Sequence, residues 1–142
     1  MDSLRLSRIL GLDYGERRIG LALSDPLGII AKPLTVIDIK KTKDYFSEIL
    51  KIINSNDVSS VVVGLPLTLK GKNSKQTEIV ISFIDQLKNK IHLPIITIDE
   101  RLSSLAAEKS LIDQGIKTGH NKALIDQTAA AIFLQEHLDS SI

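Results

Sequence analysis

The feature that most constrains the fold is a short apolar run in the middle of the chain, Ser59-Ser60-Val61-Val62-Val63. The run is β-branched and continuous, and Gly64 and Pro66 bound it. This pattern is typical of a strand that is buried on both faces, as strands of parallel sheets are. The chain is therefore predicted to build a sheet that is covered by helices.

Other segments supply the rest of this sheet and its helices. Leu6–Leu12, Ile19–Leu23 and Pro33–Ile37 have strand patterns and predict a three-strand antiparallel meander. Later segments predict a helix over Thr42–Ile53, a helix over about 74–87 capped by Asn73 or Ser74, a strand over Pro94–Ile98, and helices over Ser103–Ile112 and about 121–138. This order favours one mixed α/β sheet whose later strands are parallel, with any active site at the carboxyl ends of those strands.

Composition limits the class of protein. At 142 residues, 43% hydrophobic and 25% charged, the chain predicts one globular domain over residues 1–142. The absence of cysteine excludes disulfides and thiolate zinc sites. The N-terminus lacks a signal-peptide pattern, and no apolar run reaches the roughly 18 residues of a membrane helix, so we expect a cytoplasmic protein without a membrane partner. A net charge of +1 means that binding to a nucleic acid would need a local basic cluster.

Three carboxylates stand out by their positions. Asp13 ends the first predicted strand, Glu100 lies just beyond the strand at Pro94–Ile98, and Asp126 lies within the last helix beside small alanines. Ionised carboxylates that converge in a partly buried place repel one another, and a divalent cation is the simplest compensation. Hard oxygen ligands favour Mg²⁺ or Mn²⁺, and such ions assist phosphodiester hydrolysis. The three acids are therefore candidate catalytic residues and metal ligands.

Each acid also has a simpler explanation when it is taken alone. Asp13 could start a turn, because aspartate often precedes glycine in turns. Glu100 could be a first-turn helix acid or pair with Arg101. Asp126 could cap the last helix if that helix began later than expected. The hypothesis of a metal site therefore depends on all three acids meeting at one edge of the sheet.

Basic residues lie near these acids and in a glycine-containing loop over Thr68–Lys75, which is a candidate substrate clamp. The candidate substrate-binding residues are Arg17, Arg18, Lys72, Lys75, Arg101 and Lys122. If their loops meet at one sheet edge, they form a positive rim around an acidic centre, which suits a nucleic-acid backbone. For any single lysine, a solvated surface charge is the alternative.

Four short motifs resemble one known family. The segment GLDYGERRIGLA at residues 11–22, followed by Ser24-Asp25, resembles the opening motif of the YqgF family. These are bacterial RNase H-like proteins described as Holliday junction resolvases and as pre-16S rRNA nucleases. Further matches follow in the family's order: VGLPL at residues 63–67 with Gly71, DERLS at residues 99–103, and Asp126 through Ala129-Ala130 to Leu134-Gln135. The resemblance covers about residues 6–138.

The resemblance implies an RNase H-like α/β fold, with a mixed five-stranded sheet and helices on both faces. It implies a metal-dependent nuclease whose acids match Asp13, Glu100 and Asp126 and which uses Mg²⁺ or Mn²⁺. Arg17, Arg18 and Arg101 would orient phosphates. The implied partners are precursor ribosomal RNA in ribosome biogenesis, pre-ribosomal particles, or branched DNA. We expect a monomer or a weak homodimer.

One departure from the family pattern concerns nucleic-acid binding. Relatives often carry a dense Lys/Arg run before the last aspartate, whereas Ile116–Lys122 reads IKTGHNK and is much less basic. Three functions remain to be separated: a nuclease that trims the 5′ end of pre-16S rRNA, a Holliday junction resolvase, and a non-catalytic nucleic-acid-binding or ribosome-assembly module. Asp13-Tyr14-Gly15 also resembles the phosphate loop of sugar kinases. We reject this function, because such kinases enclose ATP between two domains and 142 residues supply only one.

Overall fold

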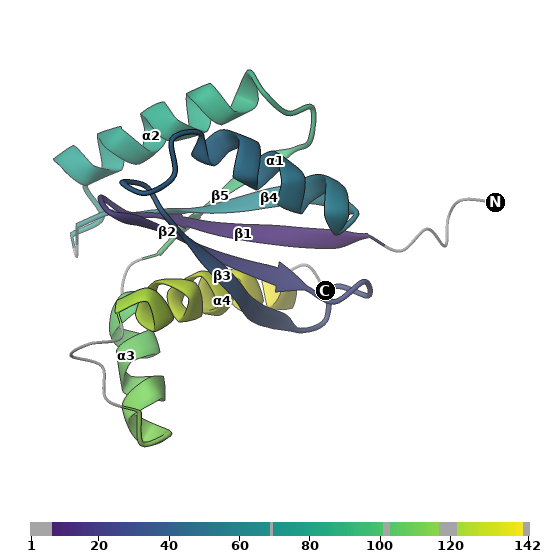
Figure 1. Ribbon diagram of the computed structural model, residues 1–142. Coiled ribbons are helices and arrows are strands. Elements are labelled where there is room, and N and C mark those ends of the chain that lie inside the picture. The colour runs from purple at the N-terminus through teal and green to yellow at the C-terminus, as the bar shows by residue number, and fades with distance from the viewer. Residues whose placement is uncertain (1–6, 69, 101–102, 117–121, 141–142) are drawn as a thin grey trace.

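The structure is a computed structural model, and it describes residues 7–68, 70–100, 103–116 and 122–140 (Figure 1). The elements follow the predicted order of three strands, then alternating helices and strands, then two helices. They are β1 (Arg8–Tyr14), β2 (Arg18–Ser24), β3 (Ala31–Asp38), α1 (Tyr45–Ser55), β4 (Val58–Leu65), α2 (Lys75–Lys88), β5 (Ile95–Asp99), α3 (Ser103–Asp113) and α4 (Lys122–Ser140).

The strands form one mixed sheet of five strands in the order β3-β2-β1-β4-β5. β1, β2 and β3 pair antiparallel, as the predicted meander requires. β4 pairs parallel to β1, and β5 pairs parallel to β4. The carboxyl ends of β1, β4 and β5 therefore meet at one edge of the sheet, which confirms the predicted mixed five-stranded sheet.

Helices cover both faces of this sheet (Figure 1). α1 and α2 lie on one face, and α4 lies across β1, β2 and β3 on the other. α3 packs against α4 and projects away from the sheet, so it forms no part of the covering layer. None of the helices in the described ranges is both long and apolar enough to cross a membrane.

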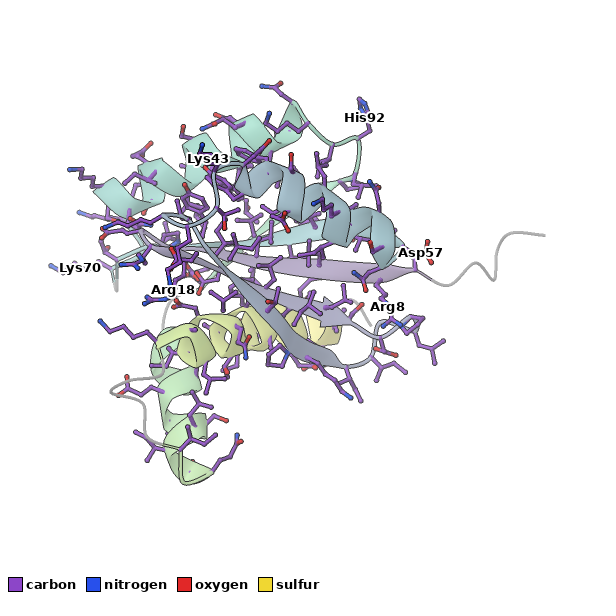
Figure 2. The ribbon with its side chains drawn as sticks, viewed as in Figure 1. Arg8, Arg18, Lys43, Asp57, Lys70 and His92 are labelled. Atoms are coloured by element: carbon purple, nitrogen blue, oxygen red, sulfur yellow. The ribbon has the colours of Figure 1, made fainter. Side chains whose placement is uncertain are left out.

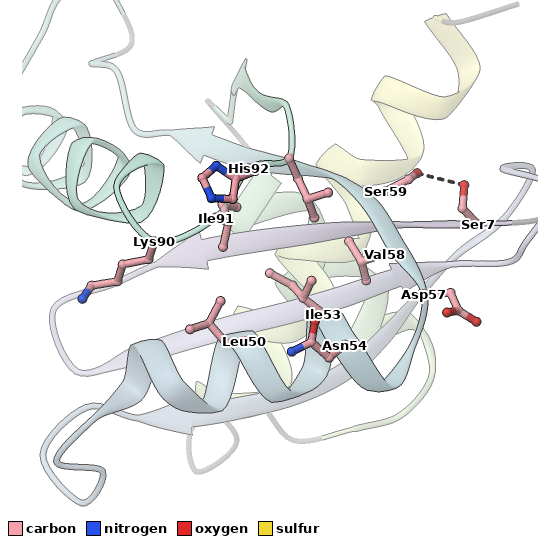
Figure 3. A pocket seen from close by; sticks show the side chains of 11 residues that line it. Ser7, Leu50, Ile53, Asn54, Asp57, Val58, Ser59, Lys90, Ile91 and His92 are labelled. Atoms are coloured by element: carbon pink, nitrogen blue, oxygen red, sulfur yellow. Dashed lines mark hydrogen bonds between the residues drawn. The ribbon is translucent and has the colours of Figure 1, made fainter.

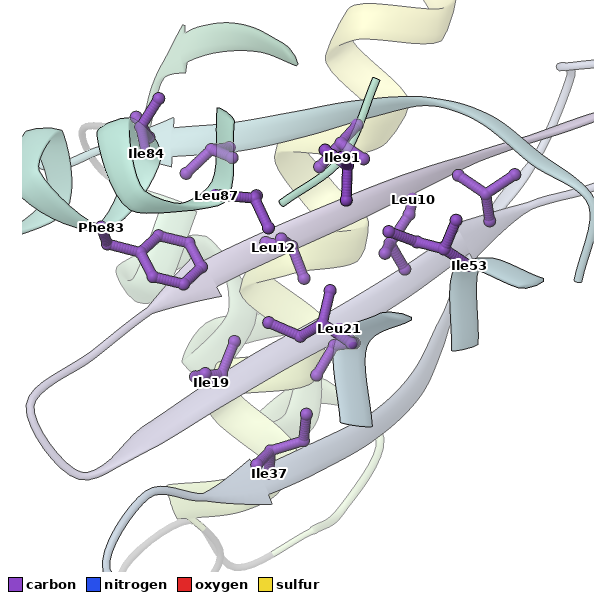
Figure 4. Close-up of a cluster of buried hydrophobic side chains, with 14 of the residues drawn as sticks. Leu10, Leu12, Ile19, Leu21, Ile37, Ile53, Phe83, Ile84, Leu87 and Ile91 are labelled. Atoms are coloured by element: carbon purple, nitrogen blue, oxygen red, sulfur yellow. The ribbon is translucent and has the colours of Figure 1, made fainter. Parts of the chain in front are cut away.

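The larger core lies between the sheet and helices α1 and α2 (Figure 4). Alternation along β1 sends Leu10 and Leu12 into this core, and both are fully buried. The intervening Gly11 faces α4, where an added Cβ would lie 3.2 Å from Leu134 Cβ. Small residues on this face of the sheet let the alanine-rich stretch of α4 approach closely, which determines where Asp126 lies.

Several element boundaries differ from the sequence prediction by one to three residues, and two of these differences have a clear physical cause. β1 continues past Leu12 to Tyr14, because Asp13 and Tyr14 pair with Gly20 and Ile19 of β2. α1 begins at Tyr45 rather than Thr42, because the side chain of Asp44 accepts a hydrogen bond from the Ser47 backbone N–H and caps the helix there.

Ser74, one of the two predicted cap residues, caps α2 and forms a capping box with Thr77. The Ser74 hydroxyl accepts a hydrogen bond from the Thr77 backbone N–H, and the Ser74 N–H donates to Thr77 Oγ1 at 2.9 Å. The buried Thr77 hydroxyl also donates to the carbonyl oxygen of Pro66, in the segment that follows β4. Thr77 therefore ties the start of α2 to the carboxyl end of β4.

Replacing Thr77 with valine is expected to lower the free energy of unfolding by about 2 kcal/mol. Valine has nearly the same shape, but it leaves the Pro66 carbonyl and the Ser74 N–H without their partner. Urea unfolding measures this loss. Ser82→Ala, at an exposed position of α2, is the control and should change stability by less than about 0.5 kcal/mol. Equal midpoints for the two variants would show that the Thr77 hydroxyl does not stabilise this junction.

Candidate active site

β1 and β5 deliver Asp13 and Glu100 to the same edge of the sheet. Asp13 is the penultimate residue of β1 and lies between Leu12 and Tyr14, so it faces α4 rather than the larger core. Glu100 directly follows β5, and its backbone N–H donates to the Leu65 carbonyl at the end of β4. The parallel register of β4 and β5 therefore holds Glu100 at the carboxyl end of β4.

Asp126 reaches this edge because α4 lies unusually close to β2. Gly20 pairs with Asp13 in the β1–β2 ladder. A Cβ added to Gly20 would overlap the Asp126 carbonyl oxygen and would lie 2.5 Å from the Asp126 carbonyl carbon. Only a glycine on β2 permits this approach, so Gly20 places the backbone of Asp126 beside the strand pair that carries Asp13.

Gly64 makes room for Glu100 in the same way. A Cβ on Gly64 would lie 2.7 Å from Glu100 Oε2 and 2.6 Å from Phe133 Cε2. The carboxylate of Glu100 and the ring of Phe133 therefore occupy the space that a larger residue on β4 would fill.

The three acids line one pocket with a volume of about 310 Å³. Its wall consists of Asp13, Tyr14, Gly15, Glu16, Pro66, Gln76, Glu100 and Asp126. Asp126 is the fifth residue of α4, which excludes the alternative that it caps the helix. The predicted convergence of three carboxylates at the carboxyl edge of the sheet is present in the structure.

Burial and mutual repulsion raise the pKa values of these acids. Burial, with the charges of Asp13 and Asp126 and a hydrogen bond to Asp13, raises the pKa of Glu100 to about 9. Burial, with the charge of Asp126, raises the pKa of Asp13 to about 6, although the hydrogen bond from Glu100 opposes this shift. The raised pKa of Glu100 favours its protonated form beside the Asp13 carboxylate.

Asp126 has a different environment. Burial raises the pKa of Asp126, whereas the positive charges of Arg18 and Lys122 act in the opposite direction. Arg18 begins β2 and Lys122 begins α4, and both charges lie near Asp126, although neither residue lines the acidic pocket. Figure 2 shows Arg18 and Lys70 at this end of the sheet, with Arg8 and Asp57 at the other.

The remaining predicted substrate-binding residues have different positions. Arg17 forms an ion pair with Asp38, with Arg17 Nε 3.4 Å from Asp38 Oδ1, and it does not line the acidic pocket. Lys72 is exposed in a turn in which its N–H donates to Thr68 Oγ1. Lys75 lines a second pocket next to the acidic one. Arg101 lies outside the described residues.

The donor set matches a hard divalent cation, but the three carboxylates are not arranged around one point. In the described part of the chain, no three His, Cys, Asp or Glu side chains form a ready-made metal cluster. The raised pKa values of Glu100 and Asp13 favour a proton on this pair, which would offset part of the negative charge. A cation would replace this proton, because oxygen ligands bind Mg²⁺ in their ionised form. The chemistry of the acidic pocket therefore suits a divalent cation such as Mg²⁺.

Gln76, Pro66 and Glu16 also line the acidic pocket, and none of them was predicted as a site residue, although Glu16 and Pro66 lie within the quoted family motifs. Gln76 follows the predicted cap residue Ser74 by two positions and therefore lies in the first turn of α2. That turn lies at the carboxyl edge of the sheet, which is the signal that could have identified Gln76. A larger pocket of about 650 Å³ lies at the opposite end of the sheet, where Ser59 of β4 hydrogen bonds to Ser7 (Figure 3). None of the predicted site residues that the structure describes lines that larger pocket.

The mixed sheet with its helices is an RNase H-like fold. RuvC of Thermus thermophilus, solved with a Holliday junction substrate, superposes with a TM-score of 0.60 at 15% identity and covers 95% of both chains. The fowlpox virus resolvase, solved with Holliday junction DNA, gives a TM-score of 0.60 at 12% identity and covers 95% of this chain and 99% of that one. At these identities the likeness establishes the fold.

The family follows from the sequence. A family model described as RuvX, Holliday junction resolvase, matches residues 7–140, and the chain belongs to this family. This result confirms the resemblance to the YqgF family. Membership places the chain among hydrolases that act on nucleic acids.

Two bacterial relatives are similar over nearly their whole length. A protein of a Roseiflexus species is 46% identical over 133 residues, which are 94% of each chain. A protein of Dictyoglomus turgidum is 40% identical over 133 residues, again 94% of each chain. Both carry the name "Putative pre-16S rRNA nuclease".

Proposed function

We propose that this protein is a cytoplasmic, divalent-metal-dependent nuclease that processes the 5′ end of precursor 16S ribosomal RNA, with residues 1–142 acting as a single nuclease domain. The observation that carries the proposal is the convergence of Asp13, Glu100 and Asp126 on one pocket at the carboxyl edge of the sheet. The names of the relatives support precursor ribosomal RNA as the substrate.

In this proposal Asp13, Glu100 and Asp126 hold Mg²⁺ or Mn²⁺. When bound, the ion supplies Lewis-acid chemistry, which polarises the phosphoryl group and makes water a better nucleophile. The protein positions the scissile phosphate above the acidic pocket. Arg18 and Lys122, whose charges already act on Asp126, bind phosphate oxygens on one side of the pocket. Lys72 and Lys75 contact the nucleic-acid strand farther from the cleaved bond, and Arg101 stays a predicted phosphate-binding residue.

A Holliday junction resolvase is the second candidate. The description of the family and the two solved resolvases with the same fold favour it. Both functions hydrolyse a phosphodiester bond, so the same three acids serve either one. They differ in assembly, because symmetric cleavage of a four-way junction needs two active sites on one substrate.

The experiment offers the protein a precursor 16S rRNA fragment and a synthetic four-way DNA junction, each with Mg²⁺, Mn²⁺ or a chelator. Asp13→Asn and Glu100→Gln are assayed beside the parent, and Glu136→Gln, at an exposed position of α4, is the control. We expect metal-dependent cleavage of the RNA by the parent and the control. Both active-site variants should lose at least about a hundredfold in rate, because each removes an ionisable ligand.

Other results would redirect the proposal. Cleavage of the junction alone, by a protein that sediments as a dimer, would establish the resolvase. Equal cleavage in chelator would contradict the metal mechanism. Binding of RNA without cleavage under any condition would indicate a ribosome-assembly module.

A further inference from the structure

A second pocket adjoins the acidic one and has a volume of about 560 Å³. It lies between the β1–β2 connection and the first turns of α2. The two pockets lie side by side, because they share a wall that consists of Tyr14, Gly15, Glu16 and Gln76. We call the second pocket the side pocket, and its other lining residues are Ser74, Lys75 and Ile79. A polymer bound at the acidic pocket can therefore continue into the side pocket.

The side pocket has an apolar surface that the fold itself leaves uncovered. The spacing of apolar residues in α2 predicts Ile79 on the buried face of this helix. The Ile79 side chain is nevertheless 39% exposed, whereas the next residue, Val80, is fully buried. Tyr14 forms part of the same wall, and its ring stacks on Phe83 with a centroid distance of 4.2 Å. This aromatic packing fixes the position of the wall, and the exposed side chain of Ile79 provides an apolar surface beside it.

Polar groups border this apolar surface. Lys75 supplies a positive charge at the start of α2. Gln76 Nε2 faces the Tyr14 carbonyl oxygen across a long 3.4 Å hydrogen bond. Gln76 Oε1 is buried, and no donor among the described residues lies within hydrogen-bonding distance of it. The Gln76 amide is thus weakly held and has unused hydrogen-bonding capacity, which is unusual for a buried group.

We propose that the side pocket binds one unpaired nucleobase of the substrate, next to the phosphodiester that is cleaved. This inference rests on the proposed nuclease function. A nucleobase combines an apolar face, which packs on Ile79, with polar edges, which the Gln76 amide can bind after a small rotation. Lys75 binds the adjoining phosphate. A base cannot enter the pocket while it is paired, so the strand is single-stranded there.

The test uses a fluorescent single-stranded RNA that the enzyme cleaves at one position, and a series of RNAs that each lack one base near that position. We expect the parent to lose about tenfold in kcat/KM at one abasic position, because an abasic site removes the contact with Ile79, and a loss of about 1.4 kcal/mol corresponds to that factor. Ile79→Ser should lose about tenfold on the complete RNA and show no further loss at that position. Ile112→Ser, at an exposed position of α3, is the matched control and should behave as the parent.

Measurements of RNA binding distinguish a failure of the base pocket from a failure of the proposed nuclease function. Asp13→Asn, with and without Ile79→Ser, is titrated with the same RNAs, and fluorescence anisotropy is measured. Loss of affinity at one abasic position that depends on Ile79 supports the base pocket even if the parent cleaves no RNA. Identical abasic profiles for the parent and Ile79→Ser would overturn the base pocket even if cleavage is metal-dependent. Equal cleavage of the same site in a duplex would also overturn it.

Discussion

Replacing Gly20 with alanine is expected to lower the free energy of unfolding by about 3 kcal/mol and the rate of cleavage by about a hundredfold. The added methyl group would overlap the backbone carbonyl of Asp126. A backbone atom cannot rotate away as a side chain can, so α4 must move from β2. That movement also carries the Asp126 carboxylate away from Asp13, and a misplacement of about 1 Å is enough for such a loss of activity.

Gly11→Ala is the matched control for this prediction. Gly11 faces the same helix, but its added Cβ would lie 3.2 Å from Leu134 Cβ and 3.3 Å from the Ala130 carbonyl oxygen. These contacts need only a small adjustment and lie farther along α4 from the acidic pocket. We expect a loss of about 1 kcal/mol with nearly unchanged cleavage. Thermal unfolding and single-turnover kinetics distinguish the two variants. A Gly20→Ala protein that keeps full activity would show that the position of Asp126 is not critical.

The acidic pocket could be predicted from the sequence because its position depends on topology. Asp13 and Glu100 lie at or just after the ends of strands, and parallel strands bring their carboxyl ends to one edge. Asp126 was harder to place, since helical periodicity says which face a residue occupies but not how close the helix lies to the sheet. Gly20 and the alanines of α4 determine that separation.

Features that depend on contacts between elements could not be predicted. The partnership of Arg17 with Asp38 requires the register of β2 and β3, which the sequence pattern leaves open. The projection of α3 from the sheet depends on its packing against α4, which the sequence pattern does not reveal. The exposure of Ile79 results from the gap between α2 and the β1–β2 connection. In each case the physical cause lies in the distance between two segments.

The pair of Glu100 and Asp13 leads to a prediction about stability. The raised pKa of Glu100, about 9, means that the metal-free folded protein keeps a proton at neutral pH that the unfolded chain releases near pH 4. The folded state therefore binds one proton more than the unfolded state between about pH 6 and pH 8. From this proton alone, the free energy of unfolding should fall by about 1.4 kcal/mol for each pH unit as the pH rises.

Glu100→Gln is expected to remove this slope and to be more stable than the parent at pH 8 when a chelator is present. Glutamine can donate the same hydrogen bond to Asp13, and it carries no charge at any pH. Urea unfolding at pH 6, 7 and 8 measures the slope, and Glu136→Gln should keep the parent's slope. If the parent and Glu100→Gln give parallel curves, Glu100 does not retain its proton in the folded state.

Divalent metal should reverse the order of stability of the parent and Glu100→Gln. A cation and a proton compete for the same oxygens of Glu100, so binding of Mg²⁺ releases the proton and is stronger at high pH. Saturating Mg²⁺ should therefore stabilise the parent more at pH 8 than at pH 6, and it should stabilise Glu100→Gln less at either pH. The variant that is most stable without metal would then be the one that gains least from it, which is the expected behaviour of a residue whose burial is costly in the apo protein and useful only when a cation is bound.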